Sequence, residues 1–301
     1  MKSRNLFAAA LIAAIAFTSC SDEDNVSTTN NLNIVRFESS VDGMPTTRNI
    51  INGDGSGQFT DGDIWGIYGK ISDPDSWPLY NDLYTIGTTK LYWNDISQDK
   101  PVVFSAYYPA MVVSDPTAFE YDVVTAFFPD LLVATPVTVS KGQTVAFNFK
   151  HVMHKLSIDI NVSNIPNADL SNYEFEILGM KSSVKINLLT GDVDYAGASG
   201  SNVYDKRNFF DLTWLLAPQD LVPGTPWIRV SGYGKTYTFK VPDDLGLGNT
   251  ANPTRLESGA RSLIYLTLYP SGSGRVSVAT VSEIIGWGTW QIMPDTNLSE
   301  D

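Results

Sequence analysis

Short stretches of alternating apolar and polar residues, separated by turn-forming residues, constrain the fold of this chain more than any other feature. In Leu156–Val162 the apolar residues occupy every second position, and Ser157, Asp159 and Asn161 lie between them. Such alternation predicts a β-strand with one face buried and the other in water. Pro, Gly, Asn and Asp interrupt every candidate helix of three turns outside residues 6–17. The sequence therefore predicts an all-β protein.

The same pattern recurs along the chain at the spacing that is typical of β-sandwiches. Further strands are predicted at Pro101–Tyr107, Thr144–Phe149, Tyr173–Leu178, Ser183–Leu188, Thr236–Val241, Ser262–Leu268 and Arg275–Val281. The run Ser271–Gly274 between the last two predicts a hairpin turn. The length of the chain suits two sandwich domains of ordinary size, which we expect at 33–150 and 151–301, the second ending in a short acidic tail.

The first 19 residues have the features of a secretion signal. Lys2 and Arg4 precede the apolar run Leu6–Phe17, which is shorter than the roughly 20 apolar residues that span a bilayer. Cys20, the single cysteine of the chain, follows directly behind Phe17-Thr-Ser. This arrangement predicts a bacterial lipoprotein that is acylated on Cys20. The alternative is ordinary signal cleavage next to an incidental cysteine. Residues 20–32 then form a linker.

The charge of the chain excludes several classes of partner. The formal net charge is −13 for all 301 residues, and loss of Lys2 and Arg4 with residues 1–19 leaves −15 on 282 residues. A protein this acidic is unsuited to nucleic acid or to anionic lipid headgroups. Any attachment to the outer membrane should therefore depend on the acyl chains. The acidic run Ser21–Asp24 resembles the export tag of surface lipoproteins, or is a solvated linker.

The first predicted strand of the mature chain is Asn33–Val41. In this strand Val35, Phe37 and Val41 should face a core, whereas Arg36 and Glu38 should point to water.

A polar, turn-prone segment follows the first strand and ends in a basic residue. The segment Asp42–Thr47 leads to Arg48, and a trypsin-like protease could cut between Arg48 and Asn49. The first strand is therefore tethered to the remaining chain by a segment that carries a potential cleavage site.

Two features invite a metal-site interpretation, and neither meets the requirements of one. His151 and His154 lie three residues apart, but the segment leads into a strand and lacks further ligands for zinc. The loop Asn52–Asp63 places oxygen-bearing residues at several EF-hand-like positions, but it has Asn at position 1 and Asp at position 12, and no flanking helices. We expect no metal and no cofactor.

Candidates for catalysis are equally weak. The sequence contains no G-x-S-x-G nucleophile motif, no cysteine nucleophile once Cys20 is acylated, and no phosphate-binding glycine loop followed by a helix. Carboxylates are numerous, so a β-scaffold hydrolase stays an alternative. We predict that the protein is not an enzyme.

Aromatic residues suggest a second, non-catalytic alternative. A surface platform for stacking glycans could be built from Trp65, Tyr107, Tyr108, Trp214, Trp227, Trp287 and Trp290. Residues of this kind more commonly pack in a core or between domains. A glycan-binding lipoprotein of a polysaccharide-uptake system is therefore the alternative function.

Several segments, taken in order, resemble the fimbrillin family (type V pilins and Mfa-like proteins) of Gram-negative anaerobes. The matching pieces are Thr47-Arg48, Phe59–Tyr68, Val103–Pro109, Asp130–Ala134, Val145–His151 continuing to Lys155-Leu156, Leu216–Gln219, Gly259 with Tyr265–Leu268, and Ile284–Trp287. They cover nearly the whole mature chain and follow a lipoprotein-like signal.

This resemblance implies two tandem transthyretin-like Greek-key β-sandwiches and a structural role at the cell surface. Family members are exported as lipoproteins, and an Arg-specific trypsin-like protease cuts behind the first strand. A strand from another fimbrillin subunit then fills the groove. By position, Arg48 and Asn49 would flank the cut, and Val35, Phe37 and Val41 would leave with the removed strand. The donor would be Trp290 and Ile292 or the segment Arg275–Ile285, unless this member stays uncleaved as an anchor.

Overall fold

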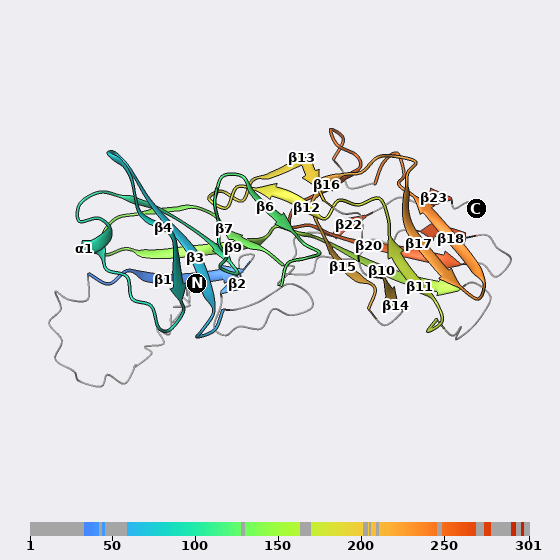
Figure 1. The fold of residues 1–301 in the computed structure, drawn as a ribbon, viewed down its shortest axis with the longest axis horizontal. Helices are drawn as coiled ribbons and strands as arrows, with labels where there is room; N and C mark the ends of the chain where they lie inside the picture. Colours follow the sequence, from blue (N-terminus) through green and yellow to red (C-terminus); the bar gives the residue numbers. More distant parts are fainter. Residues whose placement is uncertain are drawn as a thin grey trace, which may run out of the picture.

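The protein is elongated, and its N-terminal and C-terminal halves lie end to end along the long axis (Figure 1). The computed structural model describes residues 33–41, 44–45, 59–127, 130–162, 170–200, 204, 206–208, 211–245, 249–268, 274–277, 290–292 and 296–297. Nearly all regular structure in these residues is β-strand, which confirms the predicted all-β class. The finer expectation of tandem Greek-key sandwiches stays a prediction.

One mixed sheet forms the N-terminal half. Its strands lie in the order β2 (Met44–Pro45), β1 (Arg36–Val41), β9 (Thr144–His151), β7 (Leu132–Ala134), β5 (Val102–Tyr108), β3 (Ile64–Ser72) and β4 (Asp75–Thr85), and β8 (Val137–Val139) also pairs with β5. The predicted strands at Pro101–Tyr107 and Thr144–Phe149 are thus confirmed, with shifts of one or two residues at their ends.

One face of this sheet encloses the first of two hydrophobic cores. In β9 the buried residues Val145, Phe147 and Phe149 alternate with more accessible ones, as the pattern predicts. The same core receives Val35, which directly precedes β1, and residues from the other strands of the sheet: Val41, Trp65, Ile67, Leu79, Val102, Phe104, Ala106, Leu132, Ala134 and Val139. The core-facing side chains of these strands thus form one continuous apolar surface.

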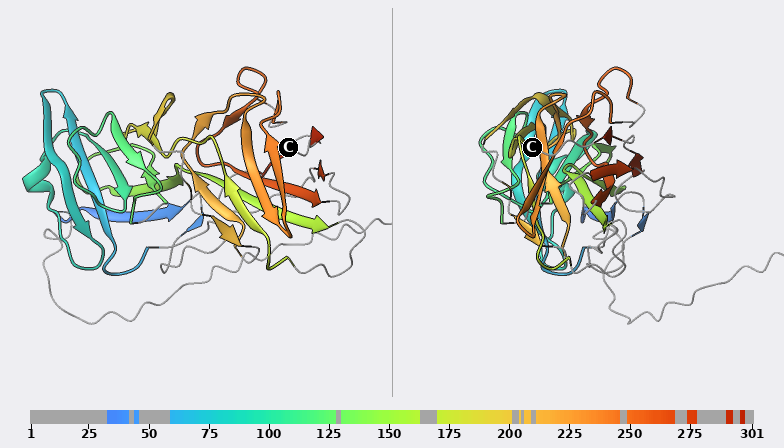
Figure 2. Two further views of the ribbon diagram at one scale, coloured as in Figure 1. Left: turned by 45° about the vertical axis from the view of Figure 1, so that its right-hand side comes forward. Right: turned by 90° about the vertical axis from the view of Figure 1, so that its right-hand side faces the viewer.

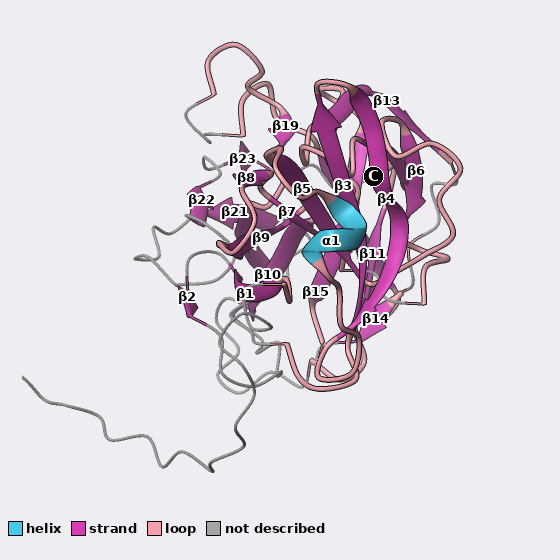
Figure 3. Ribbon diagram, turned by 90° about the vertical axis from the view of Figure 1, so that its left-hand side faces the viewer, coloured by secondary structure: helices cyan, strands magenta, loops and turns pink. Residues whose placement is uncertain are grey.

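A short helix closes the outer end of this core. Helix α1 (Trp93–Ile96) buries Trp93 and Ile96, and it lies in front in the end-on view of Figure 3. Its four residues make it far too short to cross a membrane, and the described part of the chain offers no candidate span.

The β3–β5 contact depends on one glycine. A Cβ atom on Gly66 would lie 2.2 Å from the Tyr107 ring, so only glycine lets this ring cross β3. The Tyr107 hydroxyl then donates to Asn81 Oδ1 at 2.6 Å and contacts the Met111 carbonyl oxygen at 2.9 Å. This buried ring therefore connects three segments on the face of the sheet that is opposite the first core.

The C-terminal half contains two larger sheets. The first has β15 (Thr213–Leu216), β10 (His154–Val162), β20 (Arg261–Leu268), β21 (Gly274–Ser277) and β23 (Thr296–Asn297), with β22 (Trp290–Ile292) also beside β20. The second has β14 (Arg207–Asn208), β11 (Glu174–Ile177), β17 (Pro226–Gly232) and β18 (Lys235–Lys240). The antiparallel pairing of β20 with β21 agrees with the predicted hairpin, whose turn residues lie outside the described residues.

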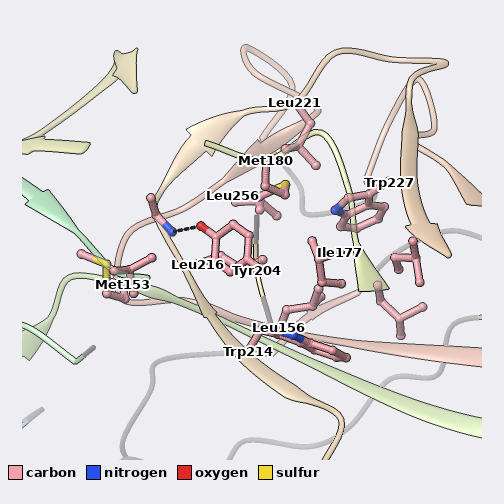
Figure 4. Packing of buried hydrophobic residues seen from close by; sticks show 14 of the residues in the cluster. Met153, Leu156, Ile177, Met180, Tyr204, Trp214, Leu216, Leu221, Trp227 and Leu256 are labelled. Carbon is pink, nitrogen blue, oxygen red and sulfur yellow. Dashed lines mark hydrogen bonds between the residues drawn. The ribbon is translucent and has the colours of Figure 1, made fainter. Parts of the chain in front are cut away.

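The second hydrophobic core lies between these sheets. Leu156, Ile158 and Ile160 of β10 are buried, as their alternation predicts. Figure 4 shows how Leu156, Trp214 and Leu216 from the first sheet approach Ile177 and Trp227 from the second.

The two halves are joined by backbone pairing as well as by the chain itself. A three-stranded sheet contains β13 (Val193–Ser199), β12 (Ser183–Ile186) and β6 (Phe119–Asp122), and a small sheet pairs β16 (Gln219–Asp220) with β19 (Arg255–Leu256). Because β6 precedes residue 150 and β12 follows it, strand pairing crosses the expected domain boundary. The division at residue 150 stays a prediction.

Candidate functional site: the first strand and its slot

Strand β1 is held in the sheet by a single long neighbour. It pairs in parallel with β9 over six residue pairs, from Arg36 with Thr144 to Val41 with Phe149. On its other edge, among the described residues, the two-residue strand β2 alone pairs with it. In the left view of Figure 2, β1 runs in blue through the lower part of the N-terminal half. The strand therefore occupies a peripheral slot rather than the middle of the sheet.

The inward side chains of β1 complete the N-terminal core. Val35 is 4% exposed and Val41 1% exposed, whereas Arg36 and Glu38 are exposed to solvent. This contrast between buried and exposed side chains follows from the two-residue period of a strand. We use the name β1 slot for the space that residues 33–41 fill between β9 and the segment after β4.

Phe37 lies at the centre of an aromatic cluster in this slot. Its ring stacks on Phe147 of β9 at a centroid distance of 5.6 Å and lies 4.7 Å from Tyr84 of β4. Edge-on contacts join it to Trp65 and Phe104. Burial raises the pKa of the Tyr84 hydroxyl, which keeps this side chain neutral beside the cluster. Phe37 thus contacts both its neighbouring strand β9 and the strand β4 at the far border of the sheet.

Residues 33–35, at the start of the first strand, form backbone hydrogen bonds with the segment that follows β4 at the far border of the sheet. Ile34 forms a β-bridge with Tyr92, and the Trp93 backbone N–H donates to the Asn33 carbonyl at 2.7 Å. The Val35 N–H donates to the Leu91 carbonyl at 2.9 Å. These bonds join residues 33–35 to the segment after β4, so the first strand is the piece that completes the enclosure of the core.

Vacating the β1 slot would carry a large cost. Burial of a Val or Phe side chain stabilises a fold by about 1.5–3 kcal/mol, and three such side chains would return to water. The outer edge of β9 would also lose its backbone partners, and an unpaired strand edge tends to recruit another strand. Chemically, the site is therefore able to bind an extended, alternately apolar peptide.

The other residues predicted for this site lie outside the described residues. These are Cys20, Arg48 and Asn49. Strand β2 ends at Pro45, three positions before Arg48 in the sequence. Lipidation of Cys20 and cleavage after Arg48 stay predictions.

The two histidines have separate, structural surroundings. His151 Nδ1 lies 3.0 Å from an oxygen of Asp130, while His154 Nδ1 donates to the Glu257 carbonyl at 2.9 Å and Nε2 contacts Ser262 Oγ at 2.9 Å. Among the described residues, no three His, Cys, Asp or Glu side chains lie close enough together to hold a metal ion. Sequence spacing gave no sign of the Asp130 contact, because these residues are 21 positions apart.

Only the end of the loop Asn52–Asp63 is described. There Asp63 accepts hydrogen bonds from the backbone N–H and the hydroxyl of Thr60, and from the Tyr108 hydroxyl. Its carboxylate thus stabilises a turn at the start of β3.

The aromatic platform considered for glycan binding is largely part of the core. Trp65, Tyr107, Trp214 and Trp227 are between 0% and 4% exposed, and Tyr108 is partly buried against the N-terminal core. Trp287 lies outside the described residues, and Trp290 belongs to β22. The packing interpretation is therefore correct for the five whose surroundings are described.

Comparison with known proteins identifies the family. The sequence model of the fimbrillin-like family matches residues 56–287, which is most of the chain. The protein therefore belongs to the fimbrillin-like family, and the resemblance found in the sequence is confirmed. The match begins after β1, so it covers the body that forms the slot rather than the strand that fills it.

Solved structures share this fold. A proposed cell adhesion protein from Bacteroides uniformis has a TM-score of 0.58 at 18% identity, covering 84% of this chain and 98% of its own. Another from Bacteroides ovatus has a TM-score of 0.53 at 17% identity, covering 83% and 99%. At such identities these structures establish the fold alone. A search of curated proteins finds no match.

Proposed function

We propose that this protein is a fimbrial subunit, or an accessory or anchor subunit of a fimbria, whose role is assembly and adhesion at the cell surface. It is exported as a lipoprotein on Cys20 and placed in the outer membrane. An Arg-specific trypsin-like protease cuts between Arg48 and Asn49, and a strand from another fimbrillin subunit takes the β1 slot. The fimbrillin-like family match supports a structural rather than a catalytic role.

The position of β1 carries this proposal. The strand completes an apolar core, and β9 is the one strand of the described residues that pairs with it along its whole length. In the sequence it continues through β2 to the segment that contains Arg48. A cut there would separate the first strand from the body while β9, β7, β5, β3 and β4 remain paired with one another. Strand addition at such an edge derives affinity from backbone hydrogen bonds and specificity from alternate side chains.

The C-terminal segment offers a candidate donor. In the described residues, strand β22 pairs with β20 over three residue pairs, so few of these backbone bonds would be lost if it left its own subunit. Trp290 and Ile292 alternate with Gln291, which is the spacing that the β1 slot accepts. The second candidate is the segment Arg275–Ile285, of which only residues 274–277 are described.

The test compares the wild-type protein with Arg48→Ala in cells that assemble fimbriae. We expect the assembled wild-type protein to start at Asn49, and Arg48→Ala to fold, to retain an acylated Cys20 and to form no polymer. Intact mass, N-terminal sequencing and electrophoresis of unheated fimbriae measure these outcomes.

The matched control is Arg36→Ala. Arg36 is exposed on β1, and its guanidinium donates to the Gly142 carbonyl at 3.2 Å. Because it lies within a paired strand, we expect its replacement to leave processing and assembly unchanged. Normal polymerisation of Arg48→Ala would contradict the mechanism, and an acylated, unpolymerised wild-type protein would identify an anchor.

A further inference from the structure

The hairpin that joins β17 to β18 carries a large aromatic side chain in a backbone conformation that such residues avoid. Tyr233 and Gly234 form the turn, with φ angles of 52° and 76°. A turn with two positive φ angles is normally built from Asn, Asp or Gly, because a bulky side chain is strained there. Backbone strain of this kind is concentrated at functional sites, so the position of the Tyr233 ring requires an explanation.

The Tyr233 ring is held in place although it faces solvent. It is 63% exposed, and its centroid lies 5.4 Å from that of the Tyr173 ring at an interplanar angle of 62°. Its hydroxyl accepts a hydrogen bond from the side-chain amide of Asn172 at 3.2 Å. These contacts orient the ring on a surface that is open to a ligand.

Tyr173 forms the base of this surface. A Cβ atom on Gly232 would lie 2.4 Å from the Tyr173 ring, so the ring lies directly on the glycine. Tyr173 is also packed, partly buried, against the C-terminal core. Strands β17 and β18 lie at the end of the molecule that is remote from the N-terminal half (Figure 1). The two rings are therefore anchored in the body of the protein at its far end.

Polar side chains flank the two rings. Lys235 is exposed and pairs with Gly232 across the hairpin, so its side chain emerges on the face that the Tyr173 ring covers. Asn172 is exposed next to the rings. An aromatic surface between an amide and an ammonium group matches a sugar, whose C–H face is apolar and whose hydroxyls donate and accept hydrogen bonds. We use the name tyrosine ledge for Tyr173, Tyr233, Asn172 and Lys235.

We propose that the tyrosine ledge binds a neutral glycan. One sugar ring stacks on Tyr233, and its hydroxyls exchange hydrogen bonds with the side chains of Asn172 and Lys235. The formal net charge of −13 disfavours acidic polysaccharides, which the chain as a whole repels. This inference rests on the proposed role in adhesion, for which it names the class of ligand. The competing explanation is that the tyrosine ledge contacts a neighbouring fimbrial subunit.

The binding test uses the full chain and soluble sugars of matched size. Cellotetraose, mannotetraose and xylotetraose are neutral chains that differ in the stereochemistry and substituents of their rings. Tetragalacturonate adds a carboxylate to each ring, and sorbitol has hydroxyl groups without a ring face. We expect saturable binding of at least one neutral tetrasaccharide in calorimetric titration, with tetragalacturonate and sorbitol each weaker by about tenfold or more.

Variants of Tyr233 separate binding from folding. Asn is favoured at positive φ, so Tyr233→Asn should keep or raise the free energy of unfolding in urea while it weakens glycan binding by about tenfold. Tyr233→Trp retains a flat ring and should bind at least as tightly as the wild-type protein, which decides the matter if Tyr233→Asn is unfolded. Tyr80→Asn is the matched control, since Tyr80 is 51% exposed in β4 of the N-terminal half.

Two results would overturn the proposal. One is the absence of saturable binding of all three neutral tetrasaccharides by the wild-type chain; loss of polymerisation in Tyr233→Asn would then identify a contact between subunits. The other is equal glycan affinity in the wild-type and Tyr233→Asn proteins. Neither result bears on processing at Arg48, because binding is measured on the unassembled chain, so this inference and the proposed assembly fail separately.

Discussion

At the scale of single residues, His154 is the group whose charge is most strongly controlled by the fold. It is fully buried at the start of β10, where its ring bonds to the Glu257 carbonyl and to Ser262. Burial lowers the pKa of His154 to about 4, because the charged ring would lose its hydration. The imidazole is therefore neutral in the folded protein and charged in the unfolded chain at mildly acidic pH.

This difference makes stability depend on pH in a definite direction. The unfolded chain binds the proton near pH 6.5 and the folded protein only near pH 4, so stability is lost as pH falls between these values. We expect His154 to reduce the free energy of unfolding by about 2 kcal/mol between pH 7 and pH 5. Urea unfolding of the wild-type and His154→Gln proteins measures this, and the variant should lose about 2 kcal/mol less over the same range. An equal fall in the free energy of unfolding in both proteins would show that His154 does not cause this pH dependence.

At the scale of elements, the sequence predicts that β1 is a strand, but it does not predict which strand pairs with it. Its strand character and its two faces follow from simple alternation, and Val35 and Val41 are indeed buried. Its partner does not follow, because parallel pairing with β9 joins residues more than 100 positions apart. The hairpin of β3 with β4 is hidden for a different reason. Its pairing contains irregularities in register, which break the alternation that identifies a strand.

Phe37 should dominate the anchoring of β1. Phe37→Ala removes a ring that contacts β9 and the far border strand β4. We expect a loss of about 3 kcal/mol in the free energy of unfolding, measured with urea. Glu38→Ala is the control on the opposite face of the same strand, and should change stability by no more than about 0.5 kcal/mol. Similar effects of the two variants would mean that β1 contributes little to the N-terminal core.

At the scale of the whole molecule, the halves are coupled by more than their covalent connection. Ser105 Oγ donates to the Leu189 carbonyl at 2.9 Å, and the Leu188 N–H donates to the Pro116 carbonyl at 2.7 Å. Tyr68 and Tyr107 of the N-terminal sheet belong to the same hydrophobic cluster as the C-terminal core. Length and composition indicate two domains but not this interface, since it depends on the pairing of β6 with β12.

We therefore expect both halves to unfold in one transition. Scanning calorimetry of the full chain should give a single peak whose calorimetric and van't Hoff enthalpies agree. Two resolved peaks would show that the contacts between the halves contribute little.

The candidate sites differ in how much of each could be predicted from the sequence alone. The first strand was predictable because a local pattern marks it. The surroundings of His151 were not, because the fold brings its ring to Asp130, which lies 21 positions away in the sequence.

The direction of β1 has a consequence for any polymer of this protein. Because β1 runs parallel to β9, a replacement strand that reproduces the same hydrogen bonds must enter the slot with the same N-to-C orientation. Each subunit would then relate to the next by the same head-to-tail operation, which never closes on a twofold axis. The resulting fibre would have two chemically different ends: one with a vacant slot and the other with an unused donor. Growth and termination would then require different partners at the two ends.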